Sequence, residues 1–471
     1  MTAEMIALSI LLVGVFLVIA KIIRIKVPIF SKFFLPSSII AGIIMLLLGP
    51  EVLGRIIPNM ENGIFNENIV SVLSRLPGLL ISVIFASLFI GKKIPSLKNM
   101  WFIAGPQAAF GQTIAWGQYV FGILVTLIIL TPLFGISPLA GALIEISFEG
   151  GHGTSAGLAN TFSELGFSEG LDLALGLATV SVIVGVIMGV VLINWAVRKN
   201  KTNYLKDSAD FSKHQVRGII KKEYRSSGST QTTSAESIEP LAFHFGLIAI
   251  AILIGKLLLE ALIWIESATW GASESVVIMR YIPLFPMAMI GGLILQLIID
   301  KFDKNNVVDR GTISRVQGLS LDFLIVSAIA TLSLTVIGSN IGPFIILAIT
   351  GILWNTIGFL ILAPKMIPKD WFERGIGDYG QSMAMTAAGI MLIRIADSNQ
   401  DTRAMEAFGY KQLMFEPFVG GGVMTAVSMP LIYNFGPVAI LIFTLLVMSF
   451  WMLIGLLYFG KKDRSKSIST N

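Results

Sequence analysis

The segment SFEGGHGTSAG, residues 147–157, places a carboxylate, an imidazole and several glycines inside one of the most apolar regions of the chain. A helix cannot stop inside lipid unless protein, water or a ligand satisfies its freed backbone groups. A glycine-rich interruption at membrane depth therefore predicts a polar cavity. The N–H groups of a half-helix starting near Thr154 would suit an anion such as a carboxylate, while carbonyl and hydroxyl oxygens would suit an alkali cation.

Two side chains of this segment could carry charge or protons. An ionisable group inside the membrane is a functional candidate, yet Glu149 could equally lie in the aqueous mouth of a re-entrant segment. His152 could donate to a substrate carboxylate or relay protons, or it could bond a carbonyl that the break frees. The substrate-binding residues predicted here are Gly150, Gly151, His152, Gly153, Thr154 and Ser155, and Thr154 and Ser155 are also predicted sodium ligands.

A second glycine-rich interruption, GDYGQSMAMTAAG at residues 377–389, offers a matching set of polar groups. Asp378 could ligate sodium or bind a substrate amine, or it could lie in cytoplasmic water. Gly380, Gln381 and Ser382 are predicted to bind substrate, and Asp378 and Ser382 to bind sodium. Glu416 lies beside the glycines of FEPFVGGG, residues 415–422. We interpret it, like Glu149, as a candidate coupling residue that lines the cavity.

The composition shows which kind of chain must position these segments. Of the 471 residues, 54% are hydrophobic and 13% are charged, and the mean hydropathy is +0.80, whereas a soluble chain is about 25% charged. The apolar runs approach the roughly 20 residues that a helix needs to cross the hydrocarbon, without the alternation of barrel strands. We therefore expect an all-α polytopic membrane protein, and no nucleic-acid partner despite the formal charge of +5.

Hydropathy predicts eleven spans, near 6–23, 36–50, 72–91, 115–134, 171–197, 241–265, 276–299, 319–337, 341–363, 412–434 and 437–459. Two further segments, about 138–164 and 375–395, are too rich in Gly, Ser and polar residues to be simple spans. We expect them to be re-entrant or broken helices. Basic residues concentrate in the loops 21–32, 91–100 and 198–240 and after Gly460, which predicts an outside N-terminus and a cytoplasmic C-terminus.

The chain also repeats itself. LPSSIIAGII, residues 35–44, and FPMAMIGGLI, residues 285–294, share a proline that is followed, after four residues, by a small residue, a glycine and two aliphatic residues. A glycine-rich break follows in each half. Since five spans precede the basic linker, the second copy starts from the opposite face of the membrane. Inverted repeats with paired broken helices are typical of secondary transporters, whose substrate site lies at those helices.

The repeat predicts four parts: a first repeat over 1–197 with its hairpin at 138–164, a basic, Ser/Thr-rich cytoplasmic linker over 198–240, a second repeat over 241–434 with its hairpin at 375–395, and an extra C-terminal span with a basic tail over 435–471. The sequence contains no cysteine, no HExxH and no phosphate-binding GxxxxGK[ST]. Thiolate chemistry and ATP-driven pumping are therefore not expected. A membrane-embedded transferase is an alternative of a different class.

Several of these segments, taken in order, resemble the bacterial glutamate:sodium symporter family: PSSIIAG, SLFIGKKIPSLK, GISPLAGALIEISFEGGHGTSAGLA, FPMAMIGG, and a second glycine-rich hairpin that ends near AFGYKQLMFEPFVGG. The family's first motif fits Gly150 to Thr154. The resemblance implies two inverted five-helix repeats, each with a hairpin between its fourth and fifth spans. It also implies sodium-driven import of glutamate across a bacterial plasma membrane, without an organic cofactor, by an elevator-like homodimer. Proton coupling through Glu149 and His152 is the alternative within transport.

Overall fold

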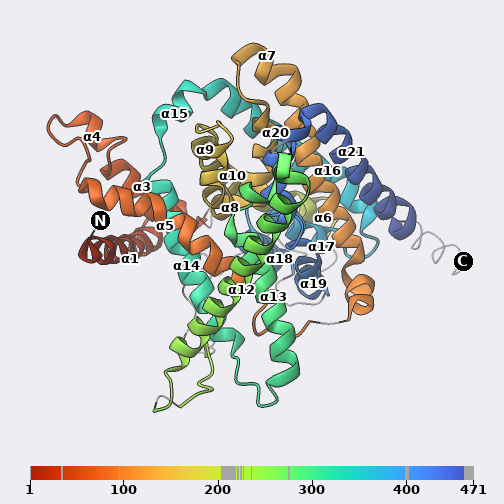
Figure 1. The fold of residues 1–471 in the computed structure, drawn as a ribbon. Coiled ribbons are helices and arrows are strands. Elements are labelled where there is room, and N and C mark those ends of the chain that lie inside the picture. Colours follow the sequence, from red (N-terminus) through yellow and green to blue (C-terminus); the bar gives the residue numbers. More distant parts are fainter. Residues whose placement is uncertain are drawn as a thin grey trace, which may run out of the picture. The chain divides into compact units, whose positions relative to one another are not determined.

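The computed structural model describes residues 2–32, 35–94, 96–202, 219, 222, 225, 227–234, 236–273, 276–397 and 402–460. Throughout these residues the chain forms helices, turns and loops, without strands (Figure 1). The all-α prediction is confirmed for this part of the chain. Most of the predicted linker and the basic tail after Gly460 lie outside the described residues.

Within the described ranges, ten helices are long and apolar enough to cross a membrane. They are Ala3–Lys26, Ser37–Ile56, Glu67–Ala86, Met100–Phe134, Gly170–Arg198, Pro240–Ala268, Leu284–Phe302, Arg310–Ala330, Ile341–Met366 and Pro437–Phe459. The chain is therefore a multi-pass membrane protein. Ten of the predicted spans correspond to these helices, and the span predicted over 412–434 does not.

That segment forms two helices instead of one. α19 (Ala404–Phe415) ends before Glu416, and α20 (Val423–Phe435) begins after Gly422. Between them, Gly420 and Gly421 adopt φ values of +72° and +100°, in the left-handed region where a residue with a Cβ loses about 1–2 kcal/mol. The prediction was wrong because apolar residues continue through the break, so hydropathy does not register it.

Both segments predicted to be broken helices are interrupted. The first contains the 3₁₀ turn η2 (Pro138–Ala142), the π-helix η3 (Glu145–Glu149), α8 (Gly151–Gly157) and α9 (Ala159–Glu164). α8 begins at Gly151 rather than near Thr154. The second contains α17 (Trp371–Met383) and α18 (Thr386–Ala396), separated by the extended residue Met385. Gly377 and Gly380 thus lie inside a helix, and the break follows them.

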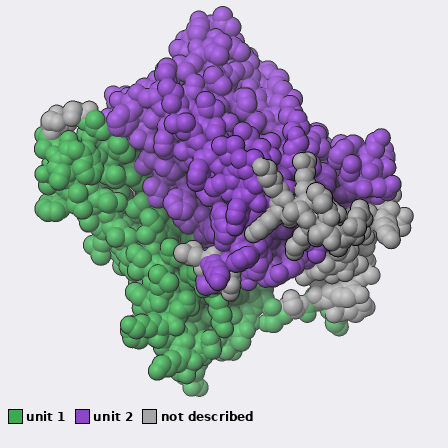
Figure 2. Space-filling model, turned by 90° about the vertical axis from the view of Figure 1, so that its right-hand side faces the viewer, with its two compact units in different colours: residues 1–94, 152–175, 212–336 green, residues 95–151, 176–211, 337–471 purple. Residues whose placement is uncertain are grey.

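The chain divides into two compact units, which Figure 2 shows in separate colours. The first unit contains residues 1–94, 152–175 and 212–336, and the second contains 95–151, 176–211 and 337–471. Each unit thus takes segments from both predicted repeats. Among the points where the chain passes from one unit to the other, one follows Ile94, one follows Gly151, one lies inside α10 (Gly170–Arg198) and one inside α15 (Leu334–Ser339).

In the first unit, helices from the two halves of the chain exchange equivalent contacts. α3 (Ser37–Leu48) packs against α1 (Ala3–Lys26) and α14 (Arg310–Ala330), and α13 (Leu284–Phe302) packs against α12 (Pro240–Ala268) and α5 (Glu67–Ala86). α5 and α14 pack against each other. Figure 1 shows α1, α3, α5 and α14 side by side. Besides α9 and most of α8, the short elements of this unit include α2 (Pro28–Lys32), α4 (Leu53–Ile56), η5 (Trp270–Ser273) and η6 (Met279–Tyr281).

The glycines of the repeated sequence lie at these contacts. A Cβ on Gly42 would come 2.7 Å from Cβ of Ile329 in α14, and a Cβ on Gly292 would come 2.2 Å from the carbonyl oxygen of Ala86 in α5. Small residues allow helix backbones to approach closely in membranes. Each repeated glycine therefore lets its own helix pack tightly on a helix from the other half.

In the second unit, α6 (Leu97–Val125) is the common packing partner. It contacts α16 (Ile341–Met366), α17, α19 and α21 (Pro437–Leu453). The π-helix η1 (Thr126–Leu130) and α7 (Thr131–Phe134) continue α6, and the π-helix η7 (Ile454–Phe459) continues α21. α6 therefore connects the first break to the helices of the second and third.

Candidate functional site

Three helix breaks meet in the second unit. Gly151, with a φ of +70°, packs on the break between α17 and α18, because a Cβ there would lie 3.2 Å from the carbonyl oxygen of Ala384. Gly420, in the break between α19 and α20, packs on η3, because a Cβ there would lie 3.4 Å from Cγ of Glu149. The first break is thus in contact with both of the others, which is the arrangement expected of a site built from broken helices.

Side chains supply hydrogen bonds to the backbone at the end of α17. The Ser382 carbonyl accepts hydrogen bonds from the amides of Gln118, at 2.9 Å, and Asn355, at 3.0 Å. The Gln118 amide also donates to Oδ1 of Asn355, at 3.0 Å. A backbone acceptor freed inside a membrane protein needs such partners. The second break is therefore held in place by α6 and α16.

Glu145 is a buried carboxylate with a complete set of donors. Its Oε2 accepts a hydrogen bond from the Tyr119 hydroxyl at 2.5 Å. Its Oε1 accepts from the Gly420 N–H at 2.9 Å and from the Thr425 hydroxyl at 2.8 Å. These bonds join η3 to α6 and to the third break. Glu145 consequently stabilises the site and does not need a ligand.

Glu149, at the other end of η3, has a different environment. Its side chain is 3% exposed, and neither carboxylate oxygen accepts a hydrogen bond from the described residues. The charges that act on it are those of Lys411, Glu145 and Asp378. Glu149 thus lies in the protein interior and not in an aqueous mouth. A buried polar group without a partner is costly and calls for an explanation.

Lys411 of α19 supplies a buried positive charge beside these acids. Its Nζ donates to Oε1 of Gln381 at 2.6 Å, lies 3.5 Å from Oδ1 of Asp378, and sits 3.6 Å from the centre of the Phe415 ring. The side chains of Lys411 and Asp378 are fully buried, so Asp378 does not lie in cytoplasmic water. Gly111 of α6 provides the space, because a Cβ there would come 2.9 Å from Nζ.

Glu416 belongs to a neighbouring network that gives its carboxylate hydrogen-bond donors. Its Oε1 accepts hydrogen bonds from the Thr386 hydroxyl at 3.1 Å and from the Gln412 amide at 2.9 Å. The Gln412 amide also donates to the Thr386 hydroxyl at 2.8 Å. Through these hydrogen bonds Glu416 links α18 to α19. Gly380 has a packing contact, since a Cβ there would come 2.9 Å from the backbone nitrogen of Gly389.

The rest of the first motif lies in the first unit. A Cβ on Gly153 would come 2.6 Å from Cδ1 of Ile81, and one on Gly157 would come 2.7 Å from Cδ1 of Phe285. Small residues one turn apart are typical of close helix packing. His152, Thr154 and Ser155 are buried, and the Thr154 hydroxyl has no hydrogen-bond partner among the described residues. The structure thus gathers Gly150, Gly151, Glu149, Asp378, Gln381 and Ser382 in the second unit, and His152, Gly153, Thr154 and Ser155 in the first.

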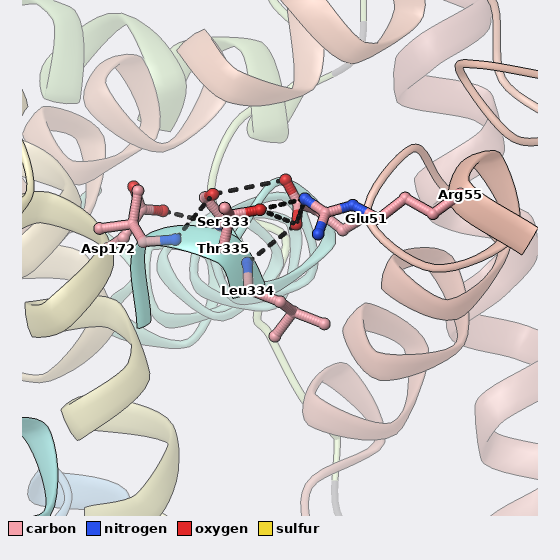
Figure 3. A network of polar contacts seen from close by, with 7 residues as sticks. Glu51, Arg55, Asp172, Ser333, Leu334 and Thr335 are labelled. Atoms are coloured by element: carbon pink, nitrogen blue, oxygen red, sulfur yellow. Dashed lines mark hydrogen bonds and ion pairs between the residues drawn. The ribbon is translucent and has the colours of Figure 1, made fainter. Parts of the chain in front are cut away.

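Another polar network lies in the first unit (Figure 3). It joins two segments, the start of α10 and residues 333–335, after each of which the chain passes into the second unit. Glu51 accepts a hydrogen bond from the Leu334 N–H at 3.0 Å and pairs with Arg55 at 2.6 Å. Arg55 also donates to the Thr335 hydroxyl. The Ser333 N–H donates to Oδ1 of Asp172 at 2.8 Å. The start of α10 is thereby tied to the residues that lead into α15.

No three His, Asp or Glu side chains among the described residues form a group that could hold a metal ion. The second unit nevertheless contains hard oxygen donors that are free of hydrogen bonds, from the carboxylates of Glu149 and Asp378 and the hydroxyl of Ser382. Oxygen donors of this kind suit hard cations such as sodium. Two of these residues, Asp378 and Ser382, are among the predicted sodium ligands.

Sequence reasoning missed Glu145, Tyr119 and Lys411. A signal was available for two of them, because Glu145 and Lys411 are charged residues within or beside apolar segments, and such residues are functional candidates. Tyr119 gave no signal, since an aromatic residue in an apolar run has no special pattern.

Residues 3–371 of the chain match the sodium/glutamate symporter family. The match runs from α1 to the first residue of α17 and covers more than half of the chain. No curated protein matches the chain. Asp378, Gln381, Ser382 and Lys411 lie outside the matched residues, whereas Glu145, Glu149 and the GGHGT motif lie within them.

Proposed function

Because the chain belongs to the sodium/glutamate symporter family, we propose that it imports L-glutamate or a related anionic amino acid or carboxylate, driven by sodium. Members of this family are transporters, so the chain is a transporter and not an enzyme, and the transferase alternative is set aside. The plasma membrane of a bacterium, with the N-terminus outside and the C-terminus in the cytoplasm, is the proposed location.

One observation carries this proposal: the break at Gly151 meets the break at Ala384 beside the buried carboxylates of Glu149 and Asp378. Broken helices offer backbone N–H groups to an anionic substrate and oxygen atoms to a cation. The proposed substrate-binding residues are Gly150, Gly151, His152, Gly153, Thr154, Ser155, Gly380, Gln381 and Ser382. Sodium would use oxygens of Thr154, Ser155, Asp378 and Ser382, and Glu149 would couple its binding to transport.

The inverted repeat is proposed as the basis of an elevator-like mechanism. It is supported by the exchanged contacts of Gly42 with α14 and of Gly292 with α5, which equivalent helices related by a two-fold axis would make. Elevator motion of a homodimer is proposed from the family. Inward movement of one positive charge yields about 2.3 kcal/mol per 100 mV of membrane potential, in addition to the sodium gradient.

Uptake of radiolabelled L-glutamate into proteoliposomes tests the proposal. An inward sodium gradient should produce accumulation above equilibrium, while an equal choline gradient should not. Unlabelled L-aspartate, succinate and L-glutamine compete in separate samples and define the substrate class. Absence of sodium-dependent accumulation of labelled L-glutamate, and of labelled L-aspartate and succinate tested in the same way, would overturn the proposal.

Proton coupling is a second candidate, because Glu149 is a buried carboxylate without a hydrogen bond among the described residues, and burial without a partner disfavours its charged form. The same vesicles distinguish the two ions. A pH gradient imposed at equal sodium on both sides drives accumulation only if protons are coupled, and a sodium gradient at constant pH drives it only if sodium is coupled.

A further inference from the structure

We propose that Lys411 is a tethered cation, which limits the Glu149–Asp378 pair to a single exchangeable monovalent cation. The exchangeable cation is sodium or a proton, because either neutralises a carboxylate. This inference rests on the proposed transport function. It assigns permanent charge compensation to Asp378, in place of a sodium-ligand role, and exchangeable compensation to Glu149.

The ammonium of Lys411 is held from several sides. Asp378 and Gln381, one turn apart on α17, both face Nζ, at 3.5 and 2.6 Å. Phe415, one turn along α19, covers it with its ring face, a favourable cation–π position. On the α6 side, a Cβ at position 111 would already come 2.6 Å from Cε of Lys411. The charge is therefore fixed beside Asp378 and cannot leave with the substrate.

The charged groups around Glu149 do not balance. Asp378 and Lys411 compensate each other, which leaves the carboxylate of Glu149. Arg374, which acts on Asp378, adds a positive charge, and Glu145, which acts on Glu149, adds a negative one. The buried carboxylate of Glu416 accepts its hydrogen bonds from Thr386 and Gln412 instead. Gln107 and Ser382 contribute only dipoles. An uncompensated charge in a protein interior is strongly unfavourable, and a single monovalent cation neutralises the carboxylate of Glu149.

This arrangement also explains how Glu149 and Asp378 can both be buried in a transporter that returns empty. Without Lys411, the pair would hold two negative charges, and the inward passage with substrate through the low-dielectric interior would take up two cations, both released inside before the empty return. With Lys411 present, one cation is sufficient. The number of cations that this pair takes up per substrate is thus set by a lysine that lies beyond the residues matched by the family.

The test compares the charge moved per substrate by wild type, K411M and the double variant D378N/K411M. Vesicles with valinomycin receive a tenfold potassium gradient, which multiplies equilibrium glutamate accumulation about tenfold for each net charge moved inward. Glutamate accumulation by K411M should rise by a further factor of about ten over wild type, because Asp378 then needs its own cation. D378N/K411M removes both charges and should return to the wild-type factor. G409A is the matched control, since Gly409 is also on α19 and has no atom within 4 Å of the added Cβ.

Separate runs with the sodium gradient or the pH gradient clamped at zero identify the extra cation. If wild type transports but the potassium gradient multiplies glutamate accumulation equally in K411M and wild type, the inference is overturned. Absence of cation-coupled accumulation by wild type would instead overturn the proposed function. If K411M is not recovered folded, E149Q gives the complementary result: its factor should fall about tenfold below wild type, and an unchanged factor would contradict the inference.

Discussion

The regions around Glu145 and Glu149 differ in hydrogen bonding although they share one π-helix. Both side chains are buried, yet Glu145 accepts hydrogen bonds from Tyr119, Gly420 and Thr425, while Glu149 accepts none from the described residues. Burial therefore does not identify the functional carboxylate. The absence of hydrogen-bond donors identifies it, because a carboxylate with a purely structural role would accept hydrogen bonds from the surrounding protein.

Glu145 and Glu149 lie at the two ends of η3, and their side chains meet different groups. The Gly150 N–H bonds to the Glu145 carbonyl at 3.0 Å, five residues back, as in a π-helix. Short π-helical turns are frequent at functional sites. Glu145 bonds to α6 and to the third break, whereas the charges that act on Glu149 include those of Asp378 in α17 and Lys411 in α19.

The largest effect on stability is expected from E145Q. Hydrogen bonds to a charged group contribute about 1.5–3 kcal/mol each, and an amide presents N–H groups where an acceptor is needed. We expect E145Q to lose about 3 kcal/mol of stability and E149Q to lose none. Thermal unfolding of both purified variants measures the difference. Equal destabilisation would remove the distinction between the two acids.

A smaller effect is expected from Y119F, which removes one donor to Glu145. The loss should be about 2 kcal/mol, because the acceptor is a carboxylate. Y379F is the matched control, since the Tyr379 hydroxyl has only a 3.4 Å contact with Thr356. The melting temperature of Y119F should fall well below that of Y379F, and sodium-driven uptake per folded molecule should be retained in both. A melting temperature of Y119F equal to that of Y379F would contradict the role given to this bond.

The contact between the breaks can be separated from backbone strain with G151A and G135A. Both glycines have positive φ, +70° and +68°, but only a Cβ on Gly151 would meet another atom within 4 Å. Each variant should lose about 1–2 kcal/mol. Initial uptake rates should fall about tenfold further in G151A than in G135A. Similar rates would show that the meeting of the two breaks is not needed for transport.

The smallest effect is expected at a satisfied carboxylate outside the spans, Asp309 before α14. Burial is the largest single influence and raises its pKa, but hydrogen bonds from the Thr312 hydroxyl and N–H and from the Thr230 N–H together outweigh burial and lower the pKa. Because the pKa is lower in the folded state, the ionised carboxylate stabilises the protein at pH values above the unfolded pKa of about 3.9. This stabilisation is lost as the pH falls through the folded pKa. The melting temperature should drop by about 1 °C more in wild type than in D309N between pH 5 and pH 3. An equal drop in both would contradict this role.

The spans and the first two breaks were predictable because their signals are local. Long apolar runs identify membrane helices, and Gly150, Gly151 and Gly153 mark an interruption within one of them. The position of the second break was not predictable, because the chain turns at Ala384 and Met385 while Gly377 and Gly380 remain helical. There the amides of Gln118 and Asn355 determine where α17 ends.

The charge cluster was only half predictable. Glu149 and Asp378 stand out as acids beside glycines, but their surroundings depend on residues distant in sequence. Thr425, which bonds to Glu145, lies 280 residues away from it. Lys411 stands at the edge of a predicted span, where a lysine usually reaches toward water. The fold turns it inward instead, toward Asp378 and Gln381.

The most direct test of the account measures concentrative uptake and exchange for wild type and E149Q reconstituted at equal density. The account predicts that E149Q exchanges internal for external labelled glutamate, while its accumulation under a tenfold potassium gradient falls about tenfold below that of wild type. Accumulation by E149Q equal to that of wild type would contradict the claim that Glu149 holds the exchangeable cation.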